Sequence, residues 1–332
     1  MSFHVTIADV AREAGVSRQT VSRVLNNKGE IREETYLRVR EVIDRLGYRP
    51  STLARGLATR RTLTIGLIVP DIANPFFADI SRGADDAVHA AGFSLLLCNS
   101  VEDPEREVDL LRTLEQRSVD GVLVCSSRLP EDQLIDLTSR HPAAVLINRC
   151  VPGSCSVCVD DAVGAGMLVR HLLSRGRRTI GCLAGSPLSY SSSERLRGFT
   201  DALAAAGEDP GLHPVVRSVP HDIEGGYYAA LTLLSQRPDV DAIICHNDLV
   251  AAGALHACAK LGRRVPDDVA VAGADDILLA SLITPALTTV RSDRHALGMR
   301  ATQMLFEQLN GEPAGCQPTM CTPELIVRAS AP

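Results

Sequence analysis

VTIADVAREAGVSRQTVSRVL, residues 5–25, contains two short helical patterns that meet at a glycine. The first helix is expected to begin after Thr6, an N-cap residue followed three positions later by Asp9 as in a capping box, and to end at Gly15. Ser17 is expected to cap the second helix. The apolar residues of that helix recur at helical spacing and should pack onto the first helix: Val21, Val24 and Leu25. The stretch therefore predicts a helix-turn-helix pair.

The polar face of the second helix carries side chains that suit DNA. An Arg side chain can fork onto guanine and Gln can pair with adenine, while hydroxyl groups at the helix N-terminus can hold phosphates. This pattern predicts a helix that enters the major groove of double-stranded DNA, and the alternative is an ordinary helical hairpin with a solvated basic face. The expected DNA contacts are Thr6, Ser17, Arg18, Gln19, Thr20, Ser22 and Arg23.

TIADVAREAGVSRQTVSRVLN, residues 6–26, resembles the opening of the LacI family of bacterial transcription regulators. The similarity continues through LGYRPSTLARGLATRRTLTIGLIVPDIANPFF, residues 46–77, and more weakly to the end of the chain. The resemblance implies a dimeric DNA-binding head (1–49), a short hinge helix and linker (50–61) and an effector-binding core (62–332) like that of periplasmic sugar-binding proteins. No cofactor and no metal are expected.

A third helix is predicted over residues 33–46, where apolar residues have helical spacing and Gly47 provides a C-cap: Leu37, Val42, Ile43 and Leu46. The following LARGLAT segment, capped by Ser51, is too short to form a stable helix alone, so it should order only with a partner copy and DNA. By the resemblance, Ala54, Arg55 and Leu57 contact DNA, and Leu57 is wedged between base steps in the minor groove. The alternative is a plain linker with two buried leucines.

Composition indicates a soluble globular protein with two or three compact units, since 332 residues are 45% hydrophobic and 22% charged. No apolar run is long enough to span a membrane, and the N-terminus does not resemble a signal peptide, so a cytoplasmic protein is expected. Residues 1–61 hold 12 basic and 7 acidic residues, a net charge of +5, whereas the remainder has a net charge of -11. A basic head on an acidic body favours approach to DNA by the head.

The ten cysteines are expected to be reduced and mostly buried, because a long chain without a signal peptide gives no reason to expect disulfides. Cys98, Cys125, Cys182 and Cys245 lie in or beside apolar strand-like runs and should belong to the core. Cys155 and Cys158 have CxxC spacing with Cys150 nearby, but no second ligand pair follows, which disfavours a metal or redox site. Their role stays open at this point.

From residue 63 onward, apolar strand-like runs alternate with helical stretches, which predicts parallel βαβ units with helices on both faces of each sheet. The fold class is therefore a small all-α head followed by an α/β core of two doubly wound parallel-sheet subdomains. The first subdomain is expected at about 62–161 and 292–323 and the second at about 162–291, with a final crossover as in the family. The chain ends without the leucine-heptad tail of some relatives, so a homodimer is expected.

Ligands of such sheets bind beyond the carboxyl ends of the strands, here in the cleft between the two halves. Carboxylate, amide and guanidinium groups with one aromatic face suit a polyhydroxylated ligand. The residues expected at the effector site, several of them by resemblance, are Asn74, Phe76, Asn148, Arg149, Ser191, Arg195, His221, Asn247 and Asp275. For each one alone the alternative is a strand-end cap or turn residue.

The sequence thus predicts a ligand-responsive transcription regulator, most simply a repressor of a carbohydrate-utilisation operon. Ala274 and His221 depart from aromatic positions of relatives, and the chain lacks Trp, which favours a sugar, sugar phosphate or sugar acid over a purine. A regulator that responds to a purine is the main alternative. A solute-binding protein would lack the basic head, and an enzyme would need a nucleophile elbow, P-loop or GxGxxG motif that the sequence does not contain.

Overall fold

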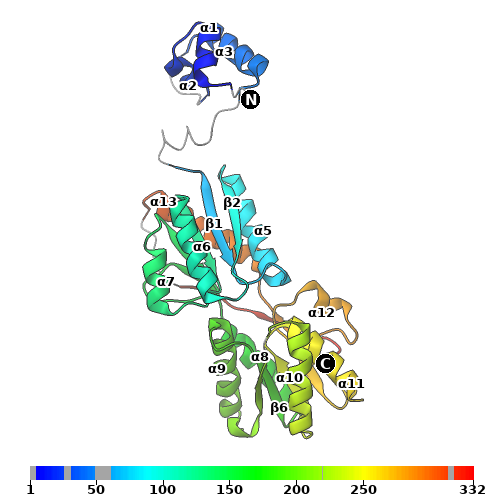
Figure 1. Ribbon diagram of the computed structural model, residues 1–332. Coiled ribbons are helices and arrows are strands. Elements are labelled where there is room, and N and C mark those ends of the chain that lie inside the picture. Colours follow the sequence, from blue (N-terminus) through cyan, green and yellow to red (C-terminus); the bar gives the residue numbers. More distant parts are fainter. Residues whose placement is uncertain (1–4, 26–30, 49–60, 219, 313–317) are drawn as a thin grey trace. The chain divides into compact units, whose positions relative to one another are not determined.

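The computed structural model describes residues 5–25, 31–48, 61–218, 220–312 and 318–332 (Figure 1). The chain divides into two compact units, Met1–Thr62 and Leu63–Pro332. The predictions for Ala54, Arg55 and Leu57 concern residues outside the described ranges. Within those ranges, no helix is both long and apolar enough to cross a membrane.

The first unit contains three helices, α1 (Ile7–Ala14), α2 (Arg18–Leu25) and α3 (Glu33–Leu46). The predicted capping box is confirmed, because Thr6 and Asp9 exchange hydrogen bonds at the start of α1. Gly15 ends α1 with φ of 65°, a left-handed conformation that glycine adopts without steric cost. Ser17 accepts a hydrogen bond from the Thr20 amide at 3.1 Å, so the local sequence signals were sufficient to place both helices.

Small β-branched residues and alanines form the core of this unit, and they come from all three helices: Val10, Ala11, Ala14, Val21, Val24, Val39, Val42 and Ile43. The predicted third helix is confirmed, but Leu37, one of the apolar residues that indicated it, lies outside this core with a side chain that is 60% exposed. Val39 occupies the core in its place, because two residues along a helix turn the side chain to a different face.

The first half of the second unit is built on a six-stranded parallel sheet with the order β11-β5-β4-β3-β1-β2. Its strands are β1 (Thr64–Val69), β2 (Ser94–Asn99), β3 (Gly121–Cys125), β4 (Ala144–Ile147), β5 (Ser156–Val159) and β11 (Thr319–Cys321). Helices cover both faces, α5 (Pro75–Ala90) and α13 (Arg294–Leu309) on one, and α6 (Pro104–Gln116) and α7 (Glu131–Thr138) on the other.

Helices α5 and α13 lie side by side although more than 200 residues separate them in the sequence (Figure 1). Glycines allow this close approach, because a Cβ atom added at Gly83 would lie 2.0 Å from the backbone oxygen of His295. Gly298 approaches the backbone oxygen of Ile80 in the same way. The first half is therefore complete only when the late segment of the chain has joined it.

The second half contains a four-stranded parallel sheet with the order β7-β6-β8-β9. Its strands are β6 (Ile180–Ala184), β7 (Val215–Arg217), β8 (Ala242–Cys245) and β9 (Ala270–Ala272). One face packs against α8 (Asp161–Ser174) and α9 (Tyr190–Ala205), and the other against α10 (Ile223–Gln236) and α11 (Asp248–Lys260). The short helices η1 (Pro210–Leu212) and α12 (Leu278–Leu282) complete this half.

Three segments pass between the halves: the β5–α8 junction, the β10–α13 junction, and the segment from β11 to β12. Strands β10 (Thr289–Arg291) and β12 (Glu324–Ile326) form an antiparallel pair. Beyond β12 the chain returns to the second half, where the Val271 amide donates to the backbone oxygen of Ser330 at 3.0 Å. The C-terminus consequently lies in the second half (Figure 1).

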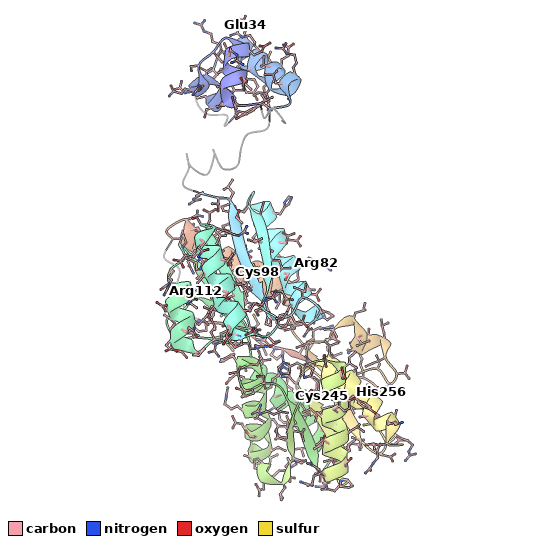
Figure 2. The ribbon with its side chains drawn as sticks, in the orientation of Figure 1. Glu34, Arg82, Cys98, Arg112, Cys245 and His256 are labelled. Carbon is pink, nitrogen blue, oxygen red and sulfur yellow. A yellow bond between two sulfur atoms is a disulfide. The ribbon has the colours of Figure 1, made fainter. Side chains whose placement is uncertain are left out.

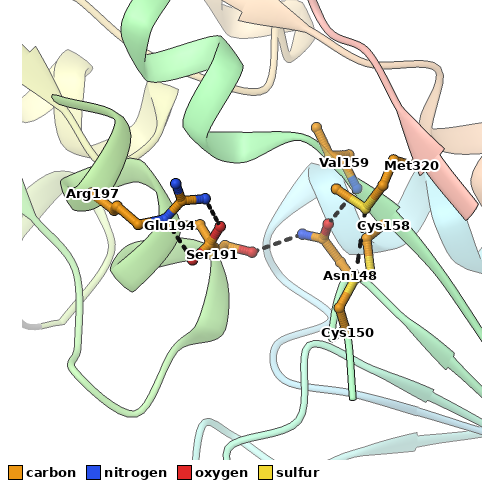
Figure 3. Close-up of a disulfide and its surroundings, with 8 residues drawn as sticks. All are labelled: Asn148, Cys150, Cys158, Val159, Ser191, Glu194, Arg197 and Met320. Atoms are coloured by element: carbon orange, nitrogen blue, oxygen red, sulfur yellow. Dashed lines mark hydrogen bonds and ion pairs between the residues drawn. A yellow bond between two sulfur atoms is a disulfide. The ribbon is translucent and has the colours of Figure 1, made fainter. Parts of the chain in front are cut away.

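The cysteines follow the prediction only in part. Cys125, Cys182 and Cys245 are buried thiols as expected, whereas Cys98 is half-buried. Figure 2 shows Cys98 in the first half and Cys245 in the second. The expectation of reduced thiols is wrong for Cys150 and Cys158, which form a disulfide with Cα atoms 6.5 Å apart (Figure 3). The spacing along the chain gave no sign of this pair, because β4 and β5 bring the two residues together.

Candidate functional site

The predicted DNA-contacting residues of the first unit lie on its surface. Thr6, Ser17, Arg18, Gln19 and Arg23 are exposed, and Thr20 and Ser22 are half-buried. Neither arginine forms an ion pair with any residue in the described ranges, so both guanidinium groups can bind an outside partner. Thr20 is instead held in place by Ser17, whose hydroxyl oxygen lies 2.9 Å from that of Thr20. The arrangement presents donors on one short helix, as readout of base edges and phosphates requires.

In the second unit, a cavity lies between the two halves, with about 380 Å³ of space not filled by protein atoms. Eight of the nine predicted effector-site residues line it: Asn74, Phe76, Asn148, Ser191, Arg195, His221, Asn247 and Asp275. They follow different strands, and the parallel topology brings the strand ends to one place.

Arg149 is the ninth predicted residue, and it does not line the cavity. Its guanidinium lies over the ring of Tyr190 in the second half, 5.6 Å from the centroid, and donates to the backbone oxygen of Leu129 at 3.3 Å. Arg149 therefore links the two halves beside the cavity without lining it.

Arg195 is the central cation of the cavity, and two buried carboxylates surround it. Its Nε lies 2.7 Å from Asp161 and its Nη2 lies 3.1 Å from Asp275, while Nη1 donates to the backbone oxygen of His246. Burial works against the charge of Arg195, but the two carboxylates raise its pKa above the ordinary value. Burial raises the pKa of Asp275 to about 6 although Arg195 opposes the shift. This network fixes the orientation of the guanidinium fork.

Two histidines of the cavity are held neutral. His221 and His246 have ring centroids 5.0 Å apart. Burial lowers the pKa of His221, and burial together with Arg195 lowers the pKa of His246 well below its ordinary value. The His221 Nε2 atom lies 2.7 Å from the Ser186 amide, so it accepts that hydrogen bond and its Nδ1 atom carries the proton. These rings add a flat surface without adding positive charge.

Asn148 links the two halves directly. Its side-chain nitrogen donates to Ser191 Oγ at 2.9 Å, and its side-chain oxygen accepts from the Val159 amide at 3.0 Å (Figure 3). The backbone of Asn148 has φ of 54°, and Asp275 has φ of 109°, both in the left-handed region. Non-glycine residues in that region cluster at functional sites, where the surrounding structure holds them. The strand-end turns therefore aim polar side chains into the cavity.

The sequence did not single out four residues that line the cavity: Glu102, Ser126, Arg128 and His246. Arg128 is 5% exposed and pairs with Glu102 at 2.5 Å, while its backbone amide donates to the buried Glu107 at 2.9 Å. Burial raises the pKa of Glu107, although Ser127 donates a hydrogen bond to it. Glu102 follows strand β2, and Ser126 and Arg128 follow strand β3. These positions were the available signal for the three residues, but the two turns carry no distinctive motif.

Arg294, the first residue of α13, connects the cavity to α5. Its guanidinium bonds Asp79 on α5 at 3.0 Å and 2.9 Å, and it also donates to the backbone oxygens of Asp275 and Asp276. Asp79 belongs to the first half, whereas Asp275 follows β9 in the second. The Arg294 side chain therefore attaches the turn that carries Asp275 to the first half.

The cavity offers hydrogen-bond donors and acceptors on all sides and two phenylalanine rings. Among its lining residues, Arg128 and Arg195 balance Glu102 and Asp275, so the formal charge is near zero. In the described ranges, no group of three or more His, Cys, Asp or Glu side chains could hold a metal ion. The geometry suits reversible binding of a small polar molecule by hydrogen bonds.

Comparisons with known proteins match both units. Residues 6–51 match the model of bacterial regulatory proteins of the lacI family, and residues 62–327 match that of periplasmic binding proteins and the sugar binding domain of the LacI family. The ribose operon repressor of Halalkalibacterium halodurans is 34% identical over 97% of this chain and 96% of its own length. The transcriptional repressor PurR of Edwardsiella ictaluri is 36% identical over 98% and 96%. The structure of the lac repressor dimer bound to operator and an anti-inducer has a TM-score of 0.91, with 25% identity over 99% of both chains.

Proposed function

The chain belongs to the LacI family of bacterial regulatory proteins, and from this we propose that it represses genes of carbohydrate use in response to a neutral sugar. It is a DNA-binding transcription regulator with a helix-turn-helix head and a periplasmic-binding-protein-like core. As a homodimer it binds a pseudo-palindromic operator, an assembly supported by the operator-bound dimer of the lac repressor. The observation that carries the sugar assignment is the balanced, hydrogen-bonding lining of the cavity.

Charge in the cavity favours a neutral ligand over an anionic one. Arg195 already bonds two carboxylates, and Arg128 already bonds Glu102. An anionic ligand would need a cation that is not neutralised in this way, because burying an unpaired negative charge is costly. A sugar acid or sugar phosphate is therefore less suitable than an uncharged sugar.

The polarity of the lining favours a sugar over a purine. Phe76 and Phe77 are the apolar side chains among the cavity residues, and their rings meet edge to face with an interplanar angle of 88°. Hydroxyl groups can donate to Asp275 and accept from Asn148 or Arg195, whereas a purine needs broad apolar contact on both faces. The relative named PurR makes a purine the alternative to be tested.

Control of DNA binding follows from contacts that cross the cleft. A ligand that touches both Asn148 and Asp275 would bind the closed arrangement of the halves more tightly than an open one, and this difference in affinity is what shifts the equilibrium. Closure would change the spacing of the two hinge segments in a dimer and hence the free energy of ordering them on DNA. Coupling of about 1–3 kcal/mol is usual for such systems.

A thermal-shift screen of the full chain tests the ligand class. Neutral pentoses and hexoses, their acids and phosphates, and purines are compared at equal concentration; the class that binds raises the melting temperature because it stabilises only the folded state. Asp275→Ala is the control variant, since it should lose the shift while the fold remains. A purine that raises the melting temperature while every neutral sugar leaves it unchanged would refute the sugar assignment.

DNA binding is tested separately by selecting bound fragments from random double-stranded DNA. The expected product is a two-fold symmetric sequence, and the neutral sugar that stabilises the protein should change its affinity. Selection of DNA without symmetry would contradict a dimer bound to a pseudo-palindrome.

A further inference from the structure

Three cysteines lie close together at one edge of the first half, away from the cavity lining. Cys150 follows β4 and is half-buried, whereas Cys155 and Cys158 are 3% and 0% exposed. The Cys150–Cys158 disulfide joins this loop to β5. Met320 on the edge strand β11 is the register partner of Cys158, and its Sδ atom lies 3.7 Å from Cys150 Sγ. A sulfur-rich cluster thus occupies the edge formed by β4, β5 and β11.

We propose that Cys150 and Cys158 form an oxidant-responsive thiol pair, whose oxidation by a hydroperoxide fixes Asn148 and so gives the regulator a second input. A regulator of bacterial genes works beside the chromosome, where thiols are kept reduced, so a disulfide there is transient and formed by an oxidant. This input goes beyond the sugar response and does not depend on which ligand the cavity binds.

The disulfide borders Asn148 on both strands that hold it. Cys150 is two residues beyond Asn148 on the β4 side, and Cys158 immediately precedes Val159 on the β5 side. The Asn148 amide donates to the backbone oxygen of Val157 at 2.7 Å, and the Asn148 side chain accepts from the Val159 amide at 3.0 Å. The covalent link therefore spans the same two strands as these hydrogen bonds (Figure 3). Forming it restricts separation of the strands at the position where Asn148 reaches Ser191 across the cleft.

Cys150 is more accessible than Cys158, so Cys150 reacts first with the hydroperoxide. The accessible Cys150 thiolate attacks the distal oxygen of the hydroperoxide, the O–O bond breaks, and the products are the Cys150 sulfenic acid and an alcohol or water. The Cys158 thiol then attacks the Cys150 sulfur, the S–S bond forms, and water leaves. The two thiols lose two electrons in total, and the hydroperoxide gains them. A low-molecular-weight thiol reverses the reaction by exchange.

The experiment uses the full chain, reduced and then treated with one equivalent of hydrogen peroxide. Peptide mapping by mass spectrometry without reductant should show residues 150 and 158 linked, with the loss of two hydrogen atoms. Hydrogen exchange of the Val159 amide should be roughly tenfold slower in the oxidised protein, because a cross-link that closes a short loop opposes local opening. This readout needs neither sugar nor DNA, so its failure is distinct from failure of the proposed function.

Three serine variants separate the pair from general oxidation. Cys98→Ser is the matched control, since Cys98 is also half-buried and lies in the same sheet, on the outer strand β2; this variant should behave as the wild type. Cys150→Ser and Cys158→Ser should each lose both the 150–158 link and the slowed exchange of the Val159 amide.

Three results would overturn the proposal. The first is a link that involves Cys155 in place of Cys150 or Cys158. The second is oxidation confined to Met320. The third is a correct Cys150–Cys158 link that leaves Val159 exchange unchanged, because the pair would then be oxidisable without acting on Asn148.

Discussion

Replacing Arg294 by Met should destabilise the second unit more than the same replacement at a nearby exposed arginine. The Arg294 side chain is 14% exposed, and it joins Asp79 on α5 to the backbone oxygens of Asp275 and Asp276. Hydrogen bonds to charged groups contribute about 1.5–3 kcal/mol each, but Asp79 is 35% exposed, so solvent screening reduces its share. The expected loss is about 2–3 kcal/mol in the free energy of unfolding. For a unit of this size, that corresponds to a fall of roughly 4–6 °C in melting temperature.

Arg291→Met provides the matched control, because Arg291 lies three residues earlier and pairs with Glu324 at 2.8 Å, where both side chains are largely exposed. It also lies 3.6 Å from Asp276, and its loss should destabilise the unit less than loss of Arg294, because solvent screens both of its ion pairs. Denaturant unfolding of Arg294→Met, Asp79→Asn and the double variant then gives the coupling between these two side chains. We expect roughly 1–2 kcal/mol. Coupling near zero, or equal losses for both arginine variants, would refute the role assigned to Arg294.

The remaining predictions concern DNA and ligand binding. Arg18→Ala should lower operator affinity by about 1–3 kcal/mol and relax one base position; equal weakening on every sequence in a competition assay would make Arg18 a phosphate contact only. Leu57→Ala should reduce DNA bending while ligand binding stays intact; an unchanged bend angle in a permuted-fragment gel would exclude the wedge. Sugar affinity, measured by calorimetry, should fall as the pH decreases from 7 to 5, because the pKa of Asp275 is about 6 and its protonated form accepts hydroxyl groups poorly. A sugar affinity that does not change with pH would exclude Asp275 from the site. Because the pKa of Asp275 is raised on folding, its protonated form stabilises the folded state at low pH, and this contribution to the free energy of unfolding is lost as the pH rises through 6.

The head could be predicted closely because its signals are local. Thr6, Gly15 and Gly47 act within one helical turn of their own positions, so the sequence alone determined where α1 and α3 end. The spacing did not show which apolar residues of α3 are buried, because Leu37 fits the helical pattern but is exposed, and only packing among three helices decides this.

The cavity could be predicted in part because parallel strands gather their carboxyl ends, which places Asn148 and Asp275 together without knowledge of the packing. Arg128 was missed because its role depends on Glu102 and Glu107, which come from other turns. Strand β5 and its disulfide were also missed, because Ser156–Val159 is too short and cysteine-rich to stand out from the surrounding loop.

The late arrival of α13 and β11 has a consequence for synthesis on the ribosome. Strand β5 is made by residue 159, but its neighbour β11 begins at residue 319, and α13 begins at residue 294. Translation adds about 5–20 residues per second, so the open edge of β5 waits roughly 10–30 s for its partner strand. The nascent first half exposes an unpaired strand edge and an uncovered apolar face during this time, and such surfaces attract chaperones or other unfinished chains. A premature stop codon anywhere between residues 160 and 319 would leave both halves incomplete, so folding of this unit follows the completion of the polypeptide.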